Sequence, residues 1–81
     1  MNFVMFSIYD RVANSYGAPQ LAQNEAAAKR AFLASASKSP FAQDFDLFVV
    51  GEFNVETGEV SVPDKPVFLM HFEDNSQQVG E

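Results

Sequence analysis

The sequence contains no cysteine, no tryptophan and only one histidine among its 81 residues. The lack of cysteine excludes disulfides and thiolate metal ligands, and a lone His71 cannot build a histidine metal cluster. We therefore expect no metal site and no cofactor. No apolar run approaches the ~20 residues that a membrane span requires. The first ten residues lack lysine and arginine and are typical of a strand rather than of a signal peptide.

Positive charge is also scarce, with five Lys and Arg against eleven Asp and Glu and a net charge of −6. Residues 1–38 hold four cations against two acids, whereas residues 39–81 hold Lys65 against nine acids. This balance excludes tight nucleic-acid binding driven by phosphates, which needs several clustered cations. A local contact by the basic residues of a helix stays open, and a solvated helix face is the alternative.

Apolar residues are abundant, at 47% of the chain, and nine of them are phenylalanines. Such a composition excludes a disordered chain. A length of 81 residues corresponds to one domain. We expect this domain to span residues 1–73 and to be followed by a polar tail over 74–81.

Three segments, 2–9, 45–53 and 67–72, carry apolar residues on both faces of a pleated strand and are typical of covered strands. In the second, Phe45, Leu47, Val49 and Phe53 are expected to share one face. Gly51 indicates a bulge or a close backbone approach. A hairpin loop at 54–59 leads to a short strand from residue 60, and a weak strand is expected at 16–21, where Pro19 limits pairing.

One segment, 25–37, has the features of a helix. Asn24 is a favourable N-cap, and the alanines that follow have the highest helix propensity. Phe32 is the expected anchor on the sheet, and Pro40 ends the helix. Phe41, in the following loop, is expected to tuck beneath that loop.

The predicted fold is α+β, a single mostly antiparallel sheet of four to five strands with one helix packed on one face. The predicted order is β-β-α-β-β, with a further strand possible at the end. One helix cannot cover two apolar faces, so we expect a second copy of the chain to cover the other. The sequence leaves open which face the helix covers. The candidate residues for this homo-oligomer interface are Phe6, Phe48, Val50, Phe68 and Phe72.

The acids and His71 are the residues that could carry acid–base catalysis. The neighbouring acids, Asp44 with Asp46 and Glu56 with Glu59, fall at a strand start and in a turn, where solubility is their simplest role. His71 could pair with a carboxylate, and a partly buried structural histidine is the alternative. The glycines form no phosphate-binding loop. We therefore expect a protein that is not an enzyme.

The aromatic strands suggest another chemistry, because a sheet that displays aromatic rings can stack unpaired bases. The residues considered for this role are Phe6, Tyr9, Phe48 and Phe72. Asp46 and Glu52 are expected on the face of Phe48, and they disfavour a phosphate backbone. A core or interface role is the competing interpretation.

Four fragments occur in a distinctive order. The first is Ser7-Ile8-Tyr9-Asp10, the second is Tyr16 with Pro19, and the third is Ala28-Lys29-Arg30-Ala31-Phe32. The fourth begins with Asp46-Leu47-Phe48, continues with Gly51-Glu52-Phe53 and ends with Thr57-Gly58-Glu59. In this order and spacing the chain resembles the small nonstructural protein of gokushovirus-type microviruses, which are single-stranded DNA phages. The resemblance covers roughly residues 3–60.

The resemblance implies a nonstructural accessory protein in the host cytoplasm that acts in DNA replication or DNA packaging, with weak single-stranded DNA binding and no catalytic residues. Lys29 and Arg30 are the leading DNA-contact candidates, and Arg11 and Lys38 are expected nearby. A phage replication or capsid protein is a further possible partner. The alternative is a protein-binding adaptor or host-interaction factor without a nucleic-acid role.

Overall fold

The computed structural model describes residues 1–73, which form one antiparallel sheet and one α-helix. The α+β class predicted from the sequence is confirmed, with two short strands before the helix where one was expected. The tail predicted at 74–81 lies outside the described residues. In chain order the elements are β1 (Asn2–Asp10), β2 (Ser15–Tyr16), β3 (Gln20–Ala22), α1 (Glu25–Ala36), the 3-10 helix η1 (Ala42–Asp44), β4 (Phe45–Asn54), β5 (Val60–Ser61) and β6 (Val67–His71).

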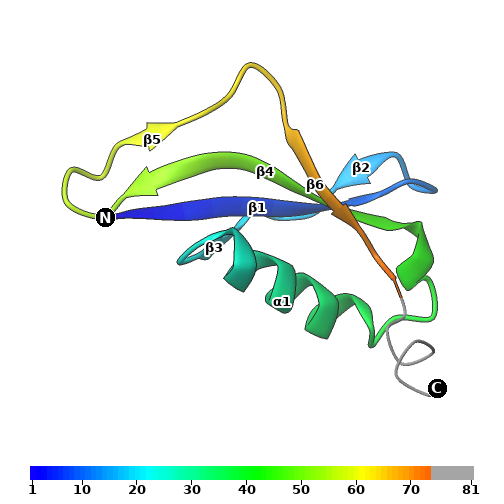
Figure 1. Cartoon of the computed structure of the whole chain (residues 1–81). Coiled ribbons are helices and arrows are strands. Elements are labelled where there is room, and N and C mark those ends of the chain that lie inside the picture. Colours follow the sequence, from blue (N-terminus) through cyan, green and yellow to red (C-terminus); the bar gives the residue numbers. More distant parts are fainter. Residues whose placement is uncertain (74–81) are drawn as a thin grey trace.

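The centre of the sheet is the long antiparallel pair of β1 and β4. β2 and β3 both pair with the outer edge of β1, and β5 and β6 both pair with the outer edge of β4. Figure 1 shows α1 on one side of this central pair. The strand expected at 16–21 is split into β2 and β3 at Gly17-Ala18-Pro19, because Pro19 has no N–H to donate to a ladder.

A β-bulge interrupts β4 at Val50. The neighbouring β1 residues Met5 and Phe6 pair with Gly51 and Val49, so Val50 is an extra residue on β4. The inserted residue reverses the alternation of side chains along the second half of β4.

The bulge corrects one prediction. Phe53 was expected on the same face as Leu47, but Leu47 pairs with Ile8 and Phe53 pairs with Phe3. These two β1 residues are five positions apart in a regular strand and therefore lie on opposite faces. Phe53 consequently points away from the face that carries Leu47.

Gly51 lies where two backbones come close together. A Cβ added there would stand 2.8 Å from the carbonyl oxygen of Ser61, so a side chain would push β5 away. This confirms the close approach predicted at Gly51. The hairpin loop predicted at 54–59 is also present, and Gly58 adopts a φ of +77° in it.

The helix α1 begins where the sequence predicted. The side chain of Asn24 accepts a hydrogen bond from the Ala27 N–H at 2.8 Å, which satisfies one free donor of the first turn. Ala28, Phe32 and Ala36 recur every four residues and form the buried stripe of the helix. The small alanines let the helix lie close to the sheet, with Phe32 as its largest buried side chain.

The hydrophobic core lies between α1 and one face of the sheet. Phe6 and Leu47 enter it from β1 and β4, and the rings of Phe32 and Phe72 pack edge to face at 6.2 Å. The helix therefore covers the face that carries Phe6. Phe6 and Phe72 are only 2% and 7% exposed, so both belong to the core of the single chain and not to a surface.

The loop after the helix differs from the prediction. Phe41 does not tuck beneath it but is 66% exposed, because Ala42 takes the buried position in this loop. Within residues 1–73, no helix has the length and apolar character that crossing a bilayer would require.

Candidate functional site: the open face of the sheet

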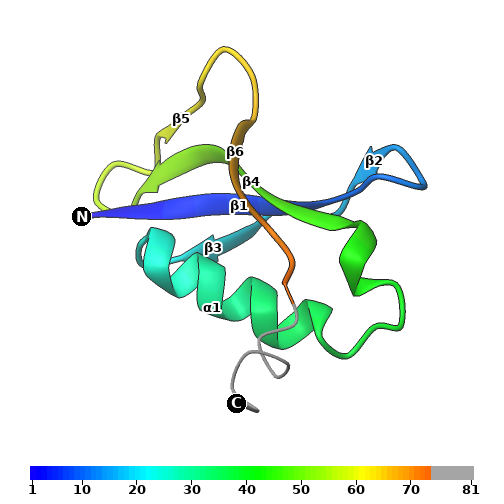
Figure 2. The same cartoon turned by 45° about the vertical axis from the view of Figure 1, so that its right-hand side comes forward.

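The face of the sheet opposite α1, called here the open face, is not covered by the helix (Figures 1 and 2). Strand pairing defines its members, because directly opposed residues share a face. Tyr16 and Phe68 are 46% and 55% exposed, and Leu21 and Val60 are similarly accessible. The apolar side chains of the open face are Phe3, Met5, Tyr9, Tyr16, Leu21, Phe48, Phe53, Val60 and Phe68.

Four of these side chains form an aromatic cluster that crosses the sheet. The Tyr9 and Tyr16 rings are 4.6 Å apart between centroids, and Phe48 lies 5.9 Å and 5.4 Å from them. Phe68 extends the cluster, 5.7 Å from Phe48 in an edge-to-face arrangement. Each such pair contributes about 0.5–1.5 kcal/mol beyond area burial. These contacts hold the four rings in place, although the open face remains accessible to solvent.

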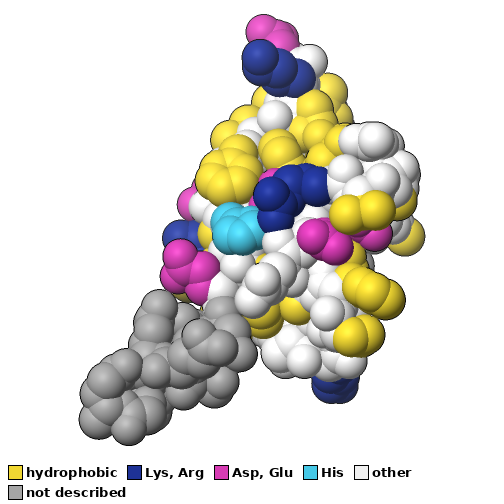
Figure 3. All heavy atoms as spheres, turned by 90° about the vertical axis from the view of Figure 1, so that its right-hand side faces the viewer, with side chains coloured by type: hydrophobic (Ala, Val, Ile, Leu, Met, Phe, Trp, Pro, Cys, Tyr) yellow, Lys and Arg dark blue, Asp and Glu magenta, His cyan; other side chains and the backbone are white. Residues whose placement is uncertain are grey.

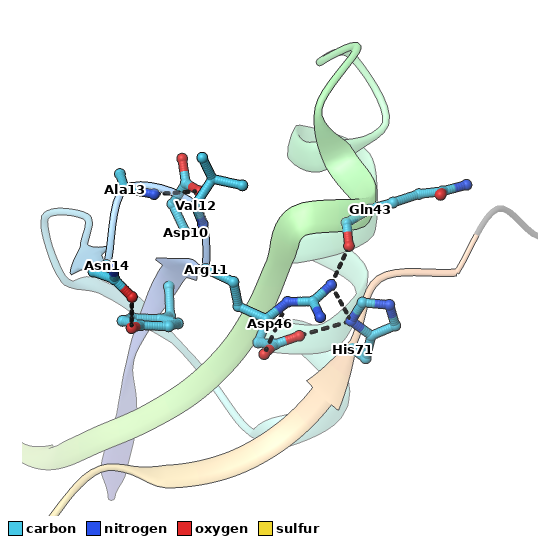
Figure 4. Close-up of polar contacts among 9 residues, drawn as sticks. Asp10, Arg11, Val12, Ala13, Asn14, Gln43, Asp46 and His71 are labelled. Atoms are coloured by element: carbon cyan, nitrogen blue, oxygen red, sulfur yellow. Dashed lines mark hydrogen bonds and ion pairs between the residues drawn. The ribbon is translucent and has the colours of Figure 1, made fainter.

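A polar group closes one end of the open face (Figure 4). His71 Nδ1 lies 2.7 Å from Asp46 Oδ1, and Arg11 Nε lies 3.7 Å from Asp46 Oδ2. The Arg11 guanidinium also donates to the carbonyl oxygen of Gln43. The group joins the residue after β1 to the start of β4 and the end of β6.

The two contacts of His71 Nδ1 compete. Asp46 carries only acceptors when ionised, so the 2.7 Å contact requires the proton on Nδ1. Arg11 Nη2, at 3.4 Å, carries only donors and would require a lone pair on the same nitrogen. We assign the hydrogen bond to Asp46 because its distance is the shorter one.

The turn that carries Arg11 is held by its own side chains. Asp10 Oδ1 accepts hydrogen bonds from the N–H groups of Val12 and Ala13, at 2.9 and 3.2 Å. Asn14 has a φ of +57°, which asparagine tolerates, and the Tyr9 hydroxyl donates to its side chain. Asp and Asn side chains thus fix the turn after β1 through hydrogen bonds to the local backbone and a left-handed backbone conformation.

The contact between His71 and Asp46 is the pairing with a carboxylate that the sequence left open. Neither residue lines the cavity near the η1 loop or the cavity near the N-terminal end of α1. Asp46 is 13% exposed at its side chain and His71 is 42% exposed. Among residues 1–73, no three acidic or histidine side chains converge on a common metal position.

The four predicted DNA-contact residues occupy two separate places. Lys29 and Arg30 are exposed on α1, and Lys38 is exposed just beyond its end. Arg11 lies at the edge of the open face, against Asp46, on the other side of the sheet. The structure therefore groups three of the candidates along the helix and separates Arg11 from them.

The five predicted interface residues occupy three different places. Phe48 and Phe68 belong to the open face, and Val50 is half-buried at the bulge, whereas Phe6 and Phe72 are in the core. The sequence prediction missed Tyr16, which completes the aromatic cluster. Its position next to Tyr9 follows from the turn at residues 10–14, which brings β2 back onto β1.

Figure 3 shows the histidine beside a basic side chain, with hydrophobic side chains gathered next to both. Together these side chains form an accessible apolar surface that ends in a neutralised polar group. Such a surface is suited to macromolecular contact.

Comparison with known proteins identifies the family. The profile described as Phage ORF5 protein matches residues 3–75, which is most of the chain. No curated protein matches the chain, and no solved structure matches it either. The match includes every helix and strand described above except the first residue of β1, Asn2. The chain therefore belongs to the Phage ORF5 protein family.

Proposed function

We propose that the chain is a nonstructural accessory protein of a gokushovirus-type microvirus, acting in replication or packaging of a single-stranded DNA genome. The family match over residues 3–75 carries this proposal. The motif order from Ser7-Ile8-Tyr9-Asp10 to Thr57-Gly58-Glu59 supports the finer, gokushovirus-type assignment. The protein would act in the host cytoplasm as a homo-oligomer, without catalysis and without a cofactor.

In this proposal the DNA contact is weak and is made by the helix. Lys29 and Arg30 are both exposed and lie about 100° apart around α1, since the helix has about 3.6 residues per turn. Neither forms an ion pair with another described residue. Arg11, already held by Asp46, would contribute little to DNA binding. Lys38 would add a further positive charge next to the end of the helix.

The net charge of −6 limits the affinity. Two phosphate contacts on single-stranded DNA give a slope of log affinity against log salt of about −1.4, from about −0.7 per phosphate. Binding should therefore be measurable at low salt and be lost near physiological ionic strength.

Fluorescence anisotropy with a labelled single-stranded oligonucleotide tests the DNA contact. We expect Lys29→Ala and Arg30→Ala each to weaken binding and to make the salt slope shallower. Lys65→Ala, which removes one exposed cation from the loop between β5 and β6, is the matched control and should change binding less. Equal effects of all three substitutions, or no binding at low salt, would reject the DNA contact.

A protein-binding role is the second candidate. The accessible apolar side chains Tyr16 and Phe68 favour it, as does the acidic balance of residues 39–81, which would attract a basic partner. A phage replication or capsid protein fits this description. Affinity capture from infected cells distinguishes the candidates: a phage replication or capsid protein supports the accessory role, and a host enzyme as the sole partner supports a host-interaction factor.

A further inference from the structure

We propose that the open face binds the open face of a second copy of the chain, so that two sheets pack together with the two α1 helices outside. This inference deepens the proposed function, because it assigns a contact surface to the homo-oligomer. It does not depend on DNA binding.

The composition of the open face favours burial. Its nine apolar side chains come from every strand of the sheet, and the most accessible of them are Phe68 (55%), Val60 (53%), Leu21 (49%) and Tyr16 (46%). Aromatic residues at the centre of a patch are typical anchors of protein interfaces. Two such faces can pack about 10 Å apart, as in other two-sheet domains.

The size of the open face is sufficient for a dimer of moderate affinity. A nine-residue β1 is about 30 Å long at about 3.3 Å per residue, and four strands side by side span about 19 Å. The product is roughly 600 Å² per copy, which reaches the lower limit of stable protein interfaces, about 1,200 Å² for both partners. We therefore expect a dimer that dissociates on dilution.

The charges favour a second copy over single-stranded nucleic acid. The cation at this face is Arg11, and it is already engaged by Asp46 and by the carbonyl oxygen of Gln43. This guanidinium is therefore not free to bind a phosphate backbone. A second apolar face, by contrast, requires no charge, and the charges of Arg11 and Asp46 offset each other.

The net negative charge gives the dimer a salt dependence opposite to that of the DNA contact. The net charge of −6 repels two copies over long range, although the open face itself carries Asp46 in an ion pair. Added salt screens this repulsion and should strengthen the dimer. The same salt should weaken the DNA contact of the helix. The two interactions can therefore be separated in one titration.

The test compares two phenylalanines of similar exposure. Phe68→Asp introduces a charge on the open face, on the edge strand β6, whereas Phe41→Asp introduces the same charge in the loop after α1, outside the strands of the sheet. Both side chains are more than half exposed, so neither change should unfold the single chain, and circular dichroism verifies this. Tyr16→Asp provides a second change on the open face.

Light scattering and sedimentation equilibrium over a wide concentration range give the mass and the dissociation constant. We expect the wild-type chain to reach twice its 9.0 kDa, and we expect Phe68→Asp and Tyr16→Asp each to raise the dissociation constant by about 100-fold or more. Phe41→Asp should behave as the wild type. Lys29→Ala should not change the mass, whatever its effect on DNA binding.

Three results would overturn the inference: a wild-type chain that stays monomeric at all concentrations, a dimer unaffected by both changes on the open face, or equal dissociation by Phe41→Asp. A monomer whose DNA binding is lost in Phe68→Asp would instead assign the open face to nucleic acid. Failure of the dimer leaves the DNA test on Lys29 and Arg30 intact, and failure of DNA binding leaves the dimer test intact.

Discussion

Removal of the Asp46 carboxylate should destabilise the fold, because this group holds β4, β6 and the turn after β1 together. Asp46 contacts His71 at 2.7 Å and Arg11 at 3.7 Å, and its own side chain is only 13% exposed. A hydrogen bond to a charged group contributes about 1.5–3 kcal/mol. Since Arg11 and His71 are 48% and 42% exposed, solvent screening reduces this value. We expect Asp46→Ala to lower the free energy of unfolding by about 1–2 kcal/mol.

Urea unfolding followed by circular dichroism measures this change, and the melting temperature should fall by about 4–8 °C per kcal/mol. Asp46→Asn retains an oxygen for the His71 N–H and should recover part of the loss. Glu56→Ala is the matched control, because Glu56 pairs with the N-terminus at 3.9 Å but is 77% exposed. Its effect should stay within about 0.5 kcal/mol. An Asp46→Ala variant as stable as the wild type, or a Glu56→Ala variant equally destabilised, would refute this assignment.

Three further substitutions probe the core, a close approach and the helix start. Phe32→Ala removes the main buried side chain of α1 and should cost about 3–5 kcal/mol in urea unfolding, a large share of the stability of so short a chain. Gly51→Ala places a Cβ against the Ser61 carbonyl and should lower the melting temperature, whereas Gly17→Ala, whose Cβ would meet its nearest neighbour at 3.5 Å, should not. Asn24→Ala removes the N-cap and should cost about 1 kcal/mol, measured in the same way.

Much of the fold could be predicted because local chemistry determines it. Asn24 and the alanines after it define the helix, and runs with apolar residues on both faces define β1 and β4. The loop at 54–59 follows from Asn54, whose side chain accepts from the N–H groups of Glu56 and Thr57, and from the positive φ of Gly58. These features depend on residues that are only a few positions apart, so they can be predicted from a local sequence pattern.

The choice of the open face could not be predicted in this way. Both faces of β1 are apolar, with Phe6 and Ile8 on one and Met5 and Tyr9 on the other, so alternation alone cannot decide which face the helix covers. The bulge at Val50 adds to the difficulty, because one inserted residue reverses the faces of everything that follows on β4. The choice depends on tertiary packing around Phe32, and the misplacement of Phe6 and Phe72 at an interface has the same origin.

The sheet-on-sheet dimer also predicts how DNA length affects binding. With the two helices outside, three layer spacings of about 10 Å each place the two helix axes about 30 Å apart, and the two Lys29 and Arg30 pairs lie on opposite sides of the dimer. An oligonucleotide too short to pass around the dimer can contact only one pair, so its affinity should be the same for the wild type and for the dissociated Phe68→Asp variant. A long strand can reach both pairs and should bind the wild type more tightly, through effective concentration. Anisotropy with short and long strands measures both cases, and a short strand that prefers the dimer would place both basic pairs on one surface, contrary to packing through the open faces.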